Sequence, residues 1–177
     1  MLPHETIVFD RAGLERTVNV TLAPTAALAF AEIVVFGRAA MGETVAGGYF
    51  SDRWRIRRGG RLMFAENFRL DGAIAARLQE TAIAKGGSAI GTLLLVPGDE
   101  EMAATVRAAA NGAVPDGADG LDGGAGLAGC RGELGISAWN GIAVARFVAA
   151  DGASLRHDLV LVLRALGRHV LPRLWQN

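Results

Sequence analysis

The chain has 177 residues, of which 51% are hydrophobic and 20% are charged, so it can bury a core and wholesale disorder is excluded. Eighteen basic residues balance eighteen acidic ones. Without a net charge, the chain has no overall field that draws it to nucleic acid or to an anionic membrane. A charge near zero also favours association with other proteins.

Cysteine usage and the apolar stretches bear on the compartment. Cys130 is the single cysteine, which excludes an internal disulfide and a cysteine cluster for a metal. The opening residues lack the basic and apolar regions of a secretory signal. The apolar stretch 22–36 is interrupted by Pro24 and Glu32, so it is too short to span a membrane. We expect a cytoplasmic protein.

The first third of the chain predicts two strands. Residues 14–22 alternate apolar and polar side chains, which is typical of a strand with one buried face. Residues 26–36 are almost uniformly apolar, which predicts a strand buried on both faces. Glu32 is an anomaly in that strand, because a buried carboxylate needs a partner.

The next segment predicts a β-hairpin. Residues 53–57 alternate arginine with bulky side chains, Gly59-Gly60 supplies a tight turn, and residues 61–70 continue as the second strand. The arginine side of the first strand is expected to face water or a partner; it carries Arg53, Arg55 and Arg57.

The middle of the chain contains one ambiguous segment and two clear elements. Residues 73–85 do not decide between a short helix and an irregular strand. Residues 89–96 form an apolar run that ends at Pro97-Gly98, which predicts a strand. A helix is predicted over about 99–110, because acidic residues open it and Asn111-Gly112 can cap its end.

The last third predicts a loop, a hairpin and a helix. Residues 112–129 are rich in glycine and alanine and predict a flexible loop. Two strand-like runs, 131–137 and 142–148, flank an Asn-Gly turn. The leucine spacing over about 153–170 predicts an amphipathic helix. Together the elements predict one α+β domain over residues 1–177, dominated by strands and containing two helices.

The sequence contains no recognised catalytic motif. The three histidines, His4, His157 and His169, lack the spacing of a metal site, and the last two are expected on the solvent side of the final helix. A phosphate-binding loop and a serine nucleophile motif are also absent from the sequence. These observations do not indicate an enzyme.

The most unusual segment is the loop 36–43. Two glycines frame an arginine, a methionine and an acid; the candidate residues are Gly37, Arg38, Met41, Gly42 and Glu43. Arg38 can hold a carboxylate with two hydrogen bonds, and either Glu43 or Glu32 is a plausible partner. Two interpretations stay open, a structural turn with an internal ion pair and a loop that docks a partner or handles a metal.

Four segments resemble one family in the order in which they occur. They are Leu-Pro-His-Glu-Thr-Ile-Val-Phe-Asp at 2–10, Phe-Gly-Arg-Ala-Ala-Met-Gly-Glu at 36–43, Asp-Arg-Trp-Arg-Ile-Arg-Arg-Gly-Gly at 52–60 and Leu-Pro-Arg-Leu-Trp at 171–175. The chain therefore resembles the UreD family of urease accessory proteins, also called UreH. The resemblance implies stacked or helically arranged sheets, both antiparallel and mixed.

The resemblance implies a maturation factor and not an enzyme. Proteins of this kind act as scaffolds, or chaperones, that bind apo-urease and, with UreF and the GTPase UreG, deliver nickel to its active site. No tightly bound cofactor is implied, only nickel in transit. Scattered carboxylates suit weak transit better than a cage of histidine and cysteine; the candidate ligands are Glu5, Glu43, Glu66 and Asp71.

Two departures from the family pattern accompany the resemblance. His4 stands where the family usually has glutamine. The family also has a strand-rich region before the 2–10 segment, so the chain resembles the C-terminal part of a larger domain, and the missing region is expected to add strands to the same sheets. Two alternatives remain: a truncated, non-functional fragment, and a β-rich hydrolase or small-molecule-binding domain with a polar cleft around His4 or Glu43.

Overall fold

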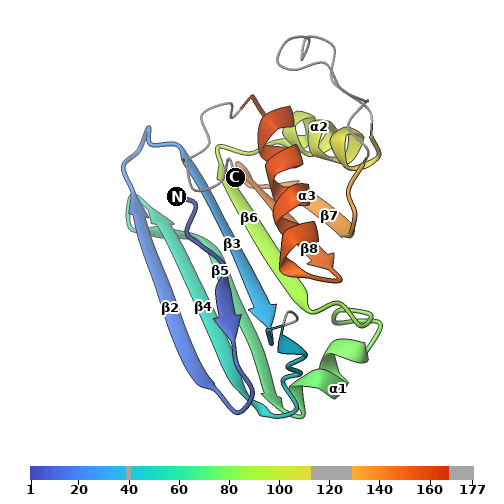
Figure 1. The fold of residues 1–177 in the computed structure, drawn as a ribbon. Coiled ribbons are helices and arrows are strands. Elements are labelled where there is room, and N and C mark those ends of the chain that lie inside the picture. The colour runs from blue at the N-terminus through green and yellow to red at the C-terminus, as the bar shows by residue number, and fades with distance from the viewer. Residues whose placement is uncertain (39–40, 113–128, 168–177) are drawn as a thin grey trace.

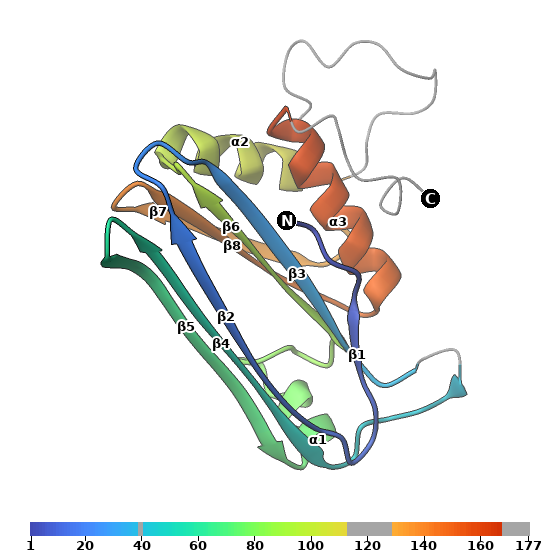
Figure 2. The same cartoon turned by 90° about the vertical axis from the view of Figure 1, so that its left-hand side faces the viewer.

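Two β-sheets lie face to face, and helices cover the outer side of the larger sheet (Figures 1 and 2). The computed structural model describes residues 1–38, 41–112 and 129–167. The α+β class dominated by strands is confirmed, with both antiparallel and mixed pairing.

The larger sheet has five strands in the order β1-β3-β6-β8-β7. β1 pairs parallel to β3, and all the other pairs are antiparallel. β7 and β8 form the hairpin predicted at Asn140-Gly141. The strands are β1 (Thr6–Val8), β3 (Leu28–Phe36), β6 (Ala89–Val96), β7 (Glu133–Trp139) and β8 (Ile142–Ala149).

The smaller sheet has three strands in the order β2-β4-β5. β2 (Gly13–Leu22) pairs parallel to β4 (Gly48–Arg58), which forms a hairpin with β5 (Arg61–Gly72). The turn between β4 and β5 is Gly59-Gly60, and both glycines have positive φ, as a two-residue hairpin turn requires. Because β2 follows β1 in the chain, this connection joins the two sheets at one edge.

Two helices pack on the outer face of the five-stranded sheet. α2 (Glu100–Ala110) and α3 (Gly152–Ala165) each begin with an aspartate N-cap, in which Asp99 accepts from Met102 N and Asp151 accepts from Ser154 N. A third helix, α1 (Ile74–Gln79), follows β5. None of the described helices has the length and apolar character needed to cross a membrane.

The buried side chains form layers on both sides of the larger sheet. One layer lies between this sheet and the helices and includes Leu93, Phe147 and Leu159. The other lies between the sheets, in two clusters around Phe50 and around Trp54. Burial on both faces explains why β3 and β6 are almost uniformly apolar.

The structure corrects the prediction in three places. The ambiguous segment 73–85 contains a short helix, so the described residues hold three helices and not two. The last helix ends at Ala165 and not near 170, because Gly167 has φ +68 and its N–H bonds to Arg164 O, which closes the helix. β5 continues to Gly72, two residues past the predicted end of this strand at residue 70. The predicted loop 112–129 lies almost entirely outside the described residues.

Candidate functional site between the sheets

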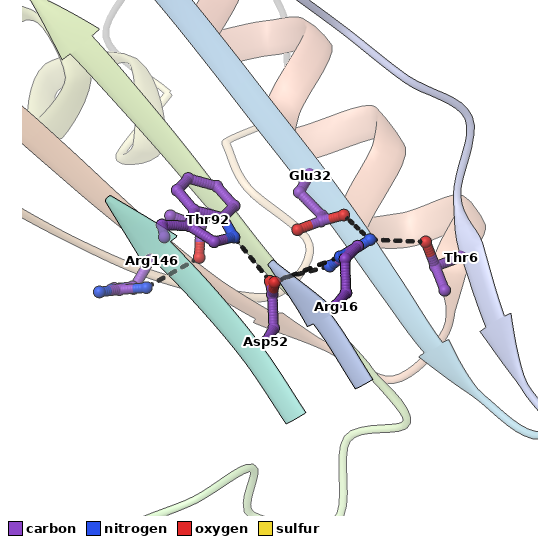
Figure 3. A network of polar contacts seen from close by, with 7 residues as sticks. Thr6, Arg16, Glu32, Asp52, Thr92 and Arg146 are labelled. Carbon is purple, nitrogen blue, oxygen red and sulfur yellow. Dashed lines mark hydrogen bonds and ion pairs between the residues drawn. The ribbon is translucent and has the colours of Figure 1, made fainter. Parts of the chain in front are cut away.

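A charged network crosses the space between the two sheets (Figure 3). Arg16 donates through Nη2 to Asp52 Oδ2 at 2.8 Å and through Nε to Asp52 Oδ1 at 3.2 Å. Its Nη1 donates to Thr6 Oγ1 at 3.1 Å and forms an ion pair with Glu32. Asp52 also accepts from Trp54 Nε1 at 2.7 Å. Four strands, β1 to β4, therefore meet at one guanidinium.

Strand alternation explains how these charges come to be buried. Along β4 the buried inner face carries Phe50, Asp52, Trp54 and Ile56 in succession. Arg16 lies directly beside Asp52 in the parallel register of β2 and β4. The carboxylate and the guanidinium thus occupy positions that the pattern assigns to apolar side chains, and each compensates the other.

Glu32 is the most perturbed group of the network. It is 5% exposed, and its Oε2 has no hydrogen-bond partner within the described residues. Burial is the largest cause that raises its pKa to about 8, and the adjacent Asp52 raises it further, while Arg16 acts in the opposite direction. Burial and Asp52 therefore favour the protonated form of Glu32, and Arg16 favours the charged form.

A cavity of about 220 Å³ adjoins the network. Its polar lining comes from Glu32, Asp52, Thr92, Glu66 and Arg146. Arg146 forms an ion pair with Glu66 and donates to Thr92 Oγ1 at 2.8 Å. Apolar side chains of both sheets complete the wall: Val34, Phe50, Trp54, Phe68, Ile83, Ile90, Phe147 and Val148.

The carboxyl groups that line the cavity are already neutralised by neighbouring groups. Within the described ranges, no group of three or more histidine, cysteine, aspartate or glutamate side chains is placed to hold a metal. An arginine or a proton already neutralises each cavity carboxyl. An entering cation would have to displace one of these, so binding in this cavity is expected to be weak.

The structure does not bring the four candidate nickel ligands together. Glu66 lines the cavity. Glu5 pairs with Arg156 of α3 at 2.8 Å, and Asp71 pairs with Arg69 at 2.6 Å on the exposed side of β5. Glu43 lies in the glycine-framed loop, so the four carboxylates occupy separate parts of the molecule.

The glycine-framed loop closes on its own ion pair. Arg38 Nε donates to Glu43 Oε2 at 2.7 Å and Nη2 donates to Oε1 at 3.3 Å. These hydrogen bonds lower the pKa of Glu43. Glu32, the other proposed partner of Arg38, binds Arg16 instead. The guanidinium of Arg38 also lies 4.9 Å from the ring centre of Phe9.

The two glycines of this loop have different roles. Gly37 has φ +86, and a Cβ at this position would lie 2.5 Å from Glu43 O, so no other residue fits. Gly42 has φ +66 and open space around it. Met41 is 72% exposed, so the loop presents an apolar side chain to the surroundings.

Other titratable groups have structural roles. Asp158 of α3 is buried and accepts from the backbone N–H groups of Arg131 and Gly132, both at 2.8 Å. His157 is half-buried with Nε2 unpartnered among the described residues, so the prediction of a solvated side chain is wrong for it; His169 lies outside those residues. Burial raises the pKa of Cys130 to about 11, which keeps it a thiol.

Sequence reasoning identified Glu32 as an anomaly but missed its partners. The signal was present, because Arg16 and Asp52 both stand on the apolar side of an alternating strand. The pattern within one strand does not show which charge of another strand lies beside it, so the pairing could not be predicted. Asp158 gave a similar signal, because it lies one turn after Leu155 and one turn before Val162 on the buried face of α3.

Fold and site together define a strand-built, two-sheet protein with a neutralised carboxyl network in its interior. The model of the family described as UreD urease accessory protein matches residues 1–176, and the chain belongs to this family.

Curated relatives agree with the family match. The chain is 54% identical over 176 residues to a urease accessory protein UreD of Rhodopseudomonas palustris (strain BisA53), an alignment that covers 99% of this chain and 55% of the relative. It is 51% identical over 176 residues to urease accessory protein UreD 3 of Bradyrhizobium sp. (strain BTAi1), covering 99% of this chain and 57% of the relative. The chain therefore spans about half the length of the curated relatives it matches.

Proposed function

We propose that this chain is part of a urease maturation factor, a non-enzymatic chaperone that binds apo-urease with UreF-type and UreG-type proteins and assists nickel insertion. The observation that carries the proposal is membership of the UreD family over residues 1–176, with relatives named as urease accessory proteins. A single, half-buried cysteine suits a reducing compartment, which supports a cytoplasmic location.

In this proposal nickel is cargo and the cavity between the sheets is part of its route. Glu66 and the unpartnered Oε2 of Glu32 are the oxygen donors that face this space. Carboxylate oxygens bind nickel more weakly than imidazole or thiolate, and Arg16 and Arg146 weaken the site further. A weak site fits a conduit, because a tight one would retain the ion.

The glycine-framed loop is the proposed docking element. The Arg38–Glu43 pair joins the two ends of the loop, and exposed Met41 and Phe9 give it apolar contact area. We expect Arg38→Ala, made in the full-length protein, to leave its melting temperature nearly unchanged and to weaken its complex with UreF or apo-urease in pull-down. Unchanged assembly and urease activation would reduce the loop to a structural turn.

The nickel route is tested by complementation in cells from which the gene has been deleted. Full-length protein carrying Glu66→Gln is compared with Glu80→Gln, a matched control in an exposed ion pair at the C-terminal end of α1. We expect Glu66→Gln to lower the nickel content and activity of urease severalfold, whereas Glu80→Gln behaves as wild type. Pull-down of UreF and the melting temperature check that the Glu66→Gln protein still folds and assembles.

Two outcomes separate the parts of this proposal. Fully active urease in nickel-replete cells that lack the whole gene would reject the maturation role. Wild-type nickel loading by Glu66→Gln would reject the cavity route and leave the maturation role standing.

The second candidate function is a small-molecule-binding or hydrolase domain. It was expected to show a polar cleft around His4 or Glu43, but neither residue lines the cavity. The observation in its favour is Glu32, an acid with a raised pKa beside a cavity. Turnover of a substrate by the purified protein, with no other protein added, would support it against the maturation role.

A further inference from the structure

Four arginines are crowded at the hairpin between β4 and β5, and we call them the hairpin arginines: Arg55, Arg57, Arg58 and Arg61. Within the described residues none of them forms an ion pair with a carboxylate, although most other arginines there do. Arg58 and Arg61 also lie directly opposite each other across the hairpin. Like charges in that position destabilise a strand pair.

The hairpin holds these groups in place. Gly59 and Gly60 form a two-residue turn with φ of +55° and +77°, which fixes the register of the tip. Arg55 Nη1 donates to the carbonyl oxygens of Trp54 and Glu66, both at 2.8 Å, so its side chain lies along the strands. Arg58 donates to Ala26 O, and its Nε is buried without a partner in the described part of the chain.

The surface around the hairpin arginines is open. α2 and α3 pack on the other sheet, and no described helix covers the outer face of β2, β4 and β5 (Figure 2). Two large apolar side chains lie at the same end. Leu62, directly opposite Arg57, is 46% exposed, and Trp139 is 42% exposed with its ring centre 6.4 Å from that of Phe64.

The other end of the same sheet shows what an ordinary solvated face looks like. There Arg53 pairs with Glu15, and Arg69 pairs with Asp71. Mixed signs of this kind are the usual surface pattern. Residues 55–64, which form the hairpin end, contain no acidic side chain, although the chain as a whole has equal numbers of acidic and basic groups.

We propose that the hairpin end of the smaller sheet is a docking site for an acidic segment of a protein partner that also carries a large apolar side chain. Carboxylates of that segment would pair with Arg57 and Arg61, and its apolar side chain would lie against Leu62 or Trp139. Arginine and tryptophan are enriched at protein interfaces and among the residues that contribute most to binding. The balanced charge of the chain speaks against a nucleic acid as the occupant.

The inference is tested on the full-length protein by fluorescence anisotropy. The probe is a labelled peptide in which glutamates flank one leucine. Two other ligands serve for comparison: the same peptide with every glutamate replaced by lysine, and a single-stranded DNA oligonucleotide. Arg57→Glu/Arg61→Glu is compared with Arg57→Lys/Arg61→Lys, which keeps the charge, and with Arg11→Glu/Arg77→Glu, which reverses two exposed charges elsewhere. Melting temperatures verify that every variant folds.

We expect the acidic peptide to bind the wild type, the lysine variant and the Arg11/Arg77 control alike, within about twofold. Binding to Arg57→Glu/Arg61→Glu should weaken by about tenfold or more, and high salt should weaken the wild-type complex. Equal binding to the reversed variant, or no binding to the wild type, overturns the inference. Tighter binding of the oligonucleotide, lost on charge reversal, overturns it in favour of a nucleic acid.

The partners named under the proposed function are measured separately, with purified UreF-type protein and apo-urease. The inference depends on the proposed function in one respect only, the choice of UreF-type protein and apo-urease as the proteins to be tested. If they bind wild type and the reversed variant equally while the acidic peptide discriminates, the site has another partner. If they bind neither form, the proposed function fails, and the peptide result still decides the inference.

Discussion

Glu32 makes the stability of the protein depend on pH in an unusual direction. Its pKa is raised to about 8 in the folded chain, whereas the ordinary value is 4.5. Between these values the folded protein retains a proton that the unfolded chain has released, so this group's contribution to the free energy of unfolding falls as pH rises from about 5 to 8. The upper limit of the slope is about 1.4 kcal/mol per pH unit.

We expect Glu32→Gln to flatten that dependence, because glutamine keeps the size of the side chain and cannot titrate. The measurement is urea denaturation of wild type and variant between pH 5 and about 8.5. The Glu80→Gln protein, with its acid exposed, serves as the control. If wild type and Glu32→Gln show the same slope, Glu32 does not hold its proton in the folded chain.

Arg16 is the cation on which the network depends. Arg16→Met keeps most of the side-chain volume but leaves Glu32 and Asp52 buried without a positive charge. We expect a loss of about 3–5 kcal/mol in the free energy of unfolding. Adding Glu32→Gln and Asp52→Asn to the same protein should recover part of that loss, because the uncompensated charge is then gone.

Urea denaturation of the single and triple variants measures this coupling. Additive effects would contradict this coupling. In that case Glu32→Gln and Asp52→Asn would lower the free energy of unfolding of the Arg16→Met protein by as much as they lower that of the wild type.

At the scale of elements, Asp158 joins α3 to the start of the β7–β8 hairpin. Its two oxygens accept the N–H groups of Arg131 and Gly132 in a buried position. We expect Asp158→Ala to cost about 2–4 kcal/mol, since two charge-assisted hydrogen bonds are lost and two backbone N–H groups lose their acceptor. Asp151→Ala, which removes only the N-cap of the same helix, should cost about 1 kcal/mol.

The two aspartates are compared by chemical denaturation of otherwise identical proteins. Equal losses for both would mean that Asp158 acts as an ordinary helix residue and that Arg131 and Gly132 find other acceptors.

Local sequence patterns were sufficient to predict most of the strands and helices. The run 89–96 coincides with β6, and the acidic start with its Asn-Gly end placed α2 within a residue. The pattern of the segment 73–85 could not decide between a helix and a strand, because α1 has only six residues, too few to show a helical period. The end of α3 was placed too late because the leucine spacing continues past Gly167, whose backbone conformation ends the helix.

The candidate site was predicted less well, for a topological reason. Residues 16, 32 and 52 meet only because β2 crosses to the other sheet and then pairs parallel to β4. No short-range pattern encodes that crossing. Glu66, chosen from the sequence on chemistry alone, does reach the cavity, whereas Glu5 and Asp71 bind arginines elsewhere.

At the scale of the whole molecule, the strand order predicts which backbone groups are best protected. β4, β6 and β8 have a hydrogen-bonded neighbour on each side, whereas β2, β5 and β7 each have one on a single side only among the described strands. We expect amide hydrogens of β6 and β8 to exchange slowest and those of β5 and β7 to exchange over a wide range, alternating along the strand. Hydrogen exchange with residue resolution tests this, and uniform protection of β5 would mean that another segment or partner pairs with it.

The ion pair between Glu5 and Arg156 has a consequence during synthesis. The two residues are 151 positions apart, and α3 is the last helix among the described elements. Glu5 therefore leaves the ribosome long before Arg156 does, and this ion pair can form only after α3 has been synthesised. During that interval β1 can already pair with β3, but Glu5 lacks the Arg156 partner that it has in the folded protein.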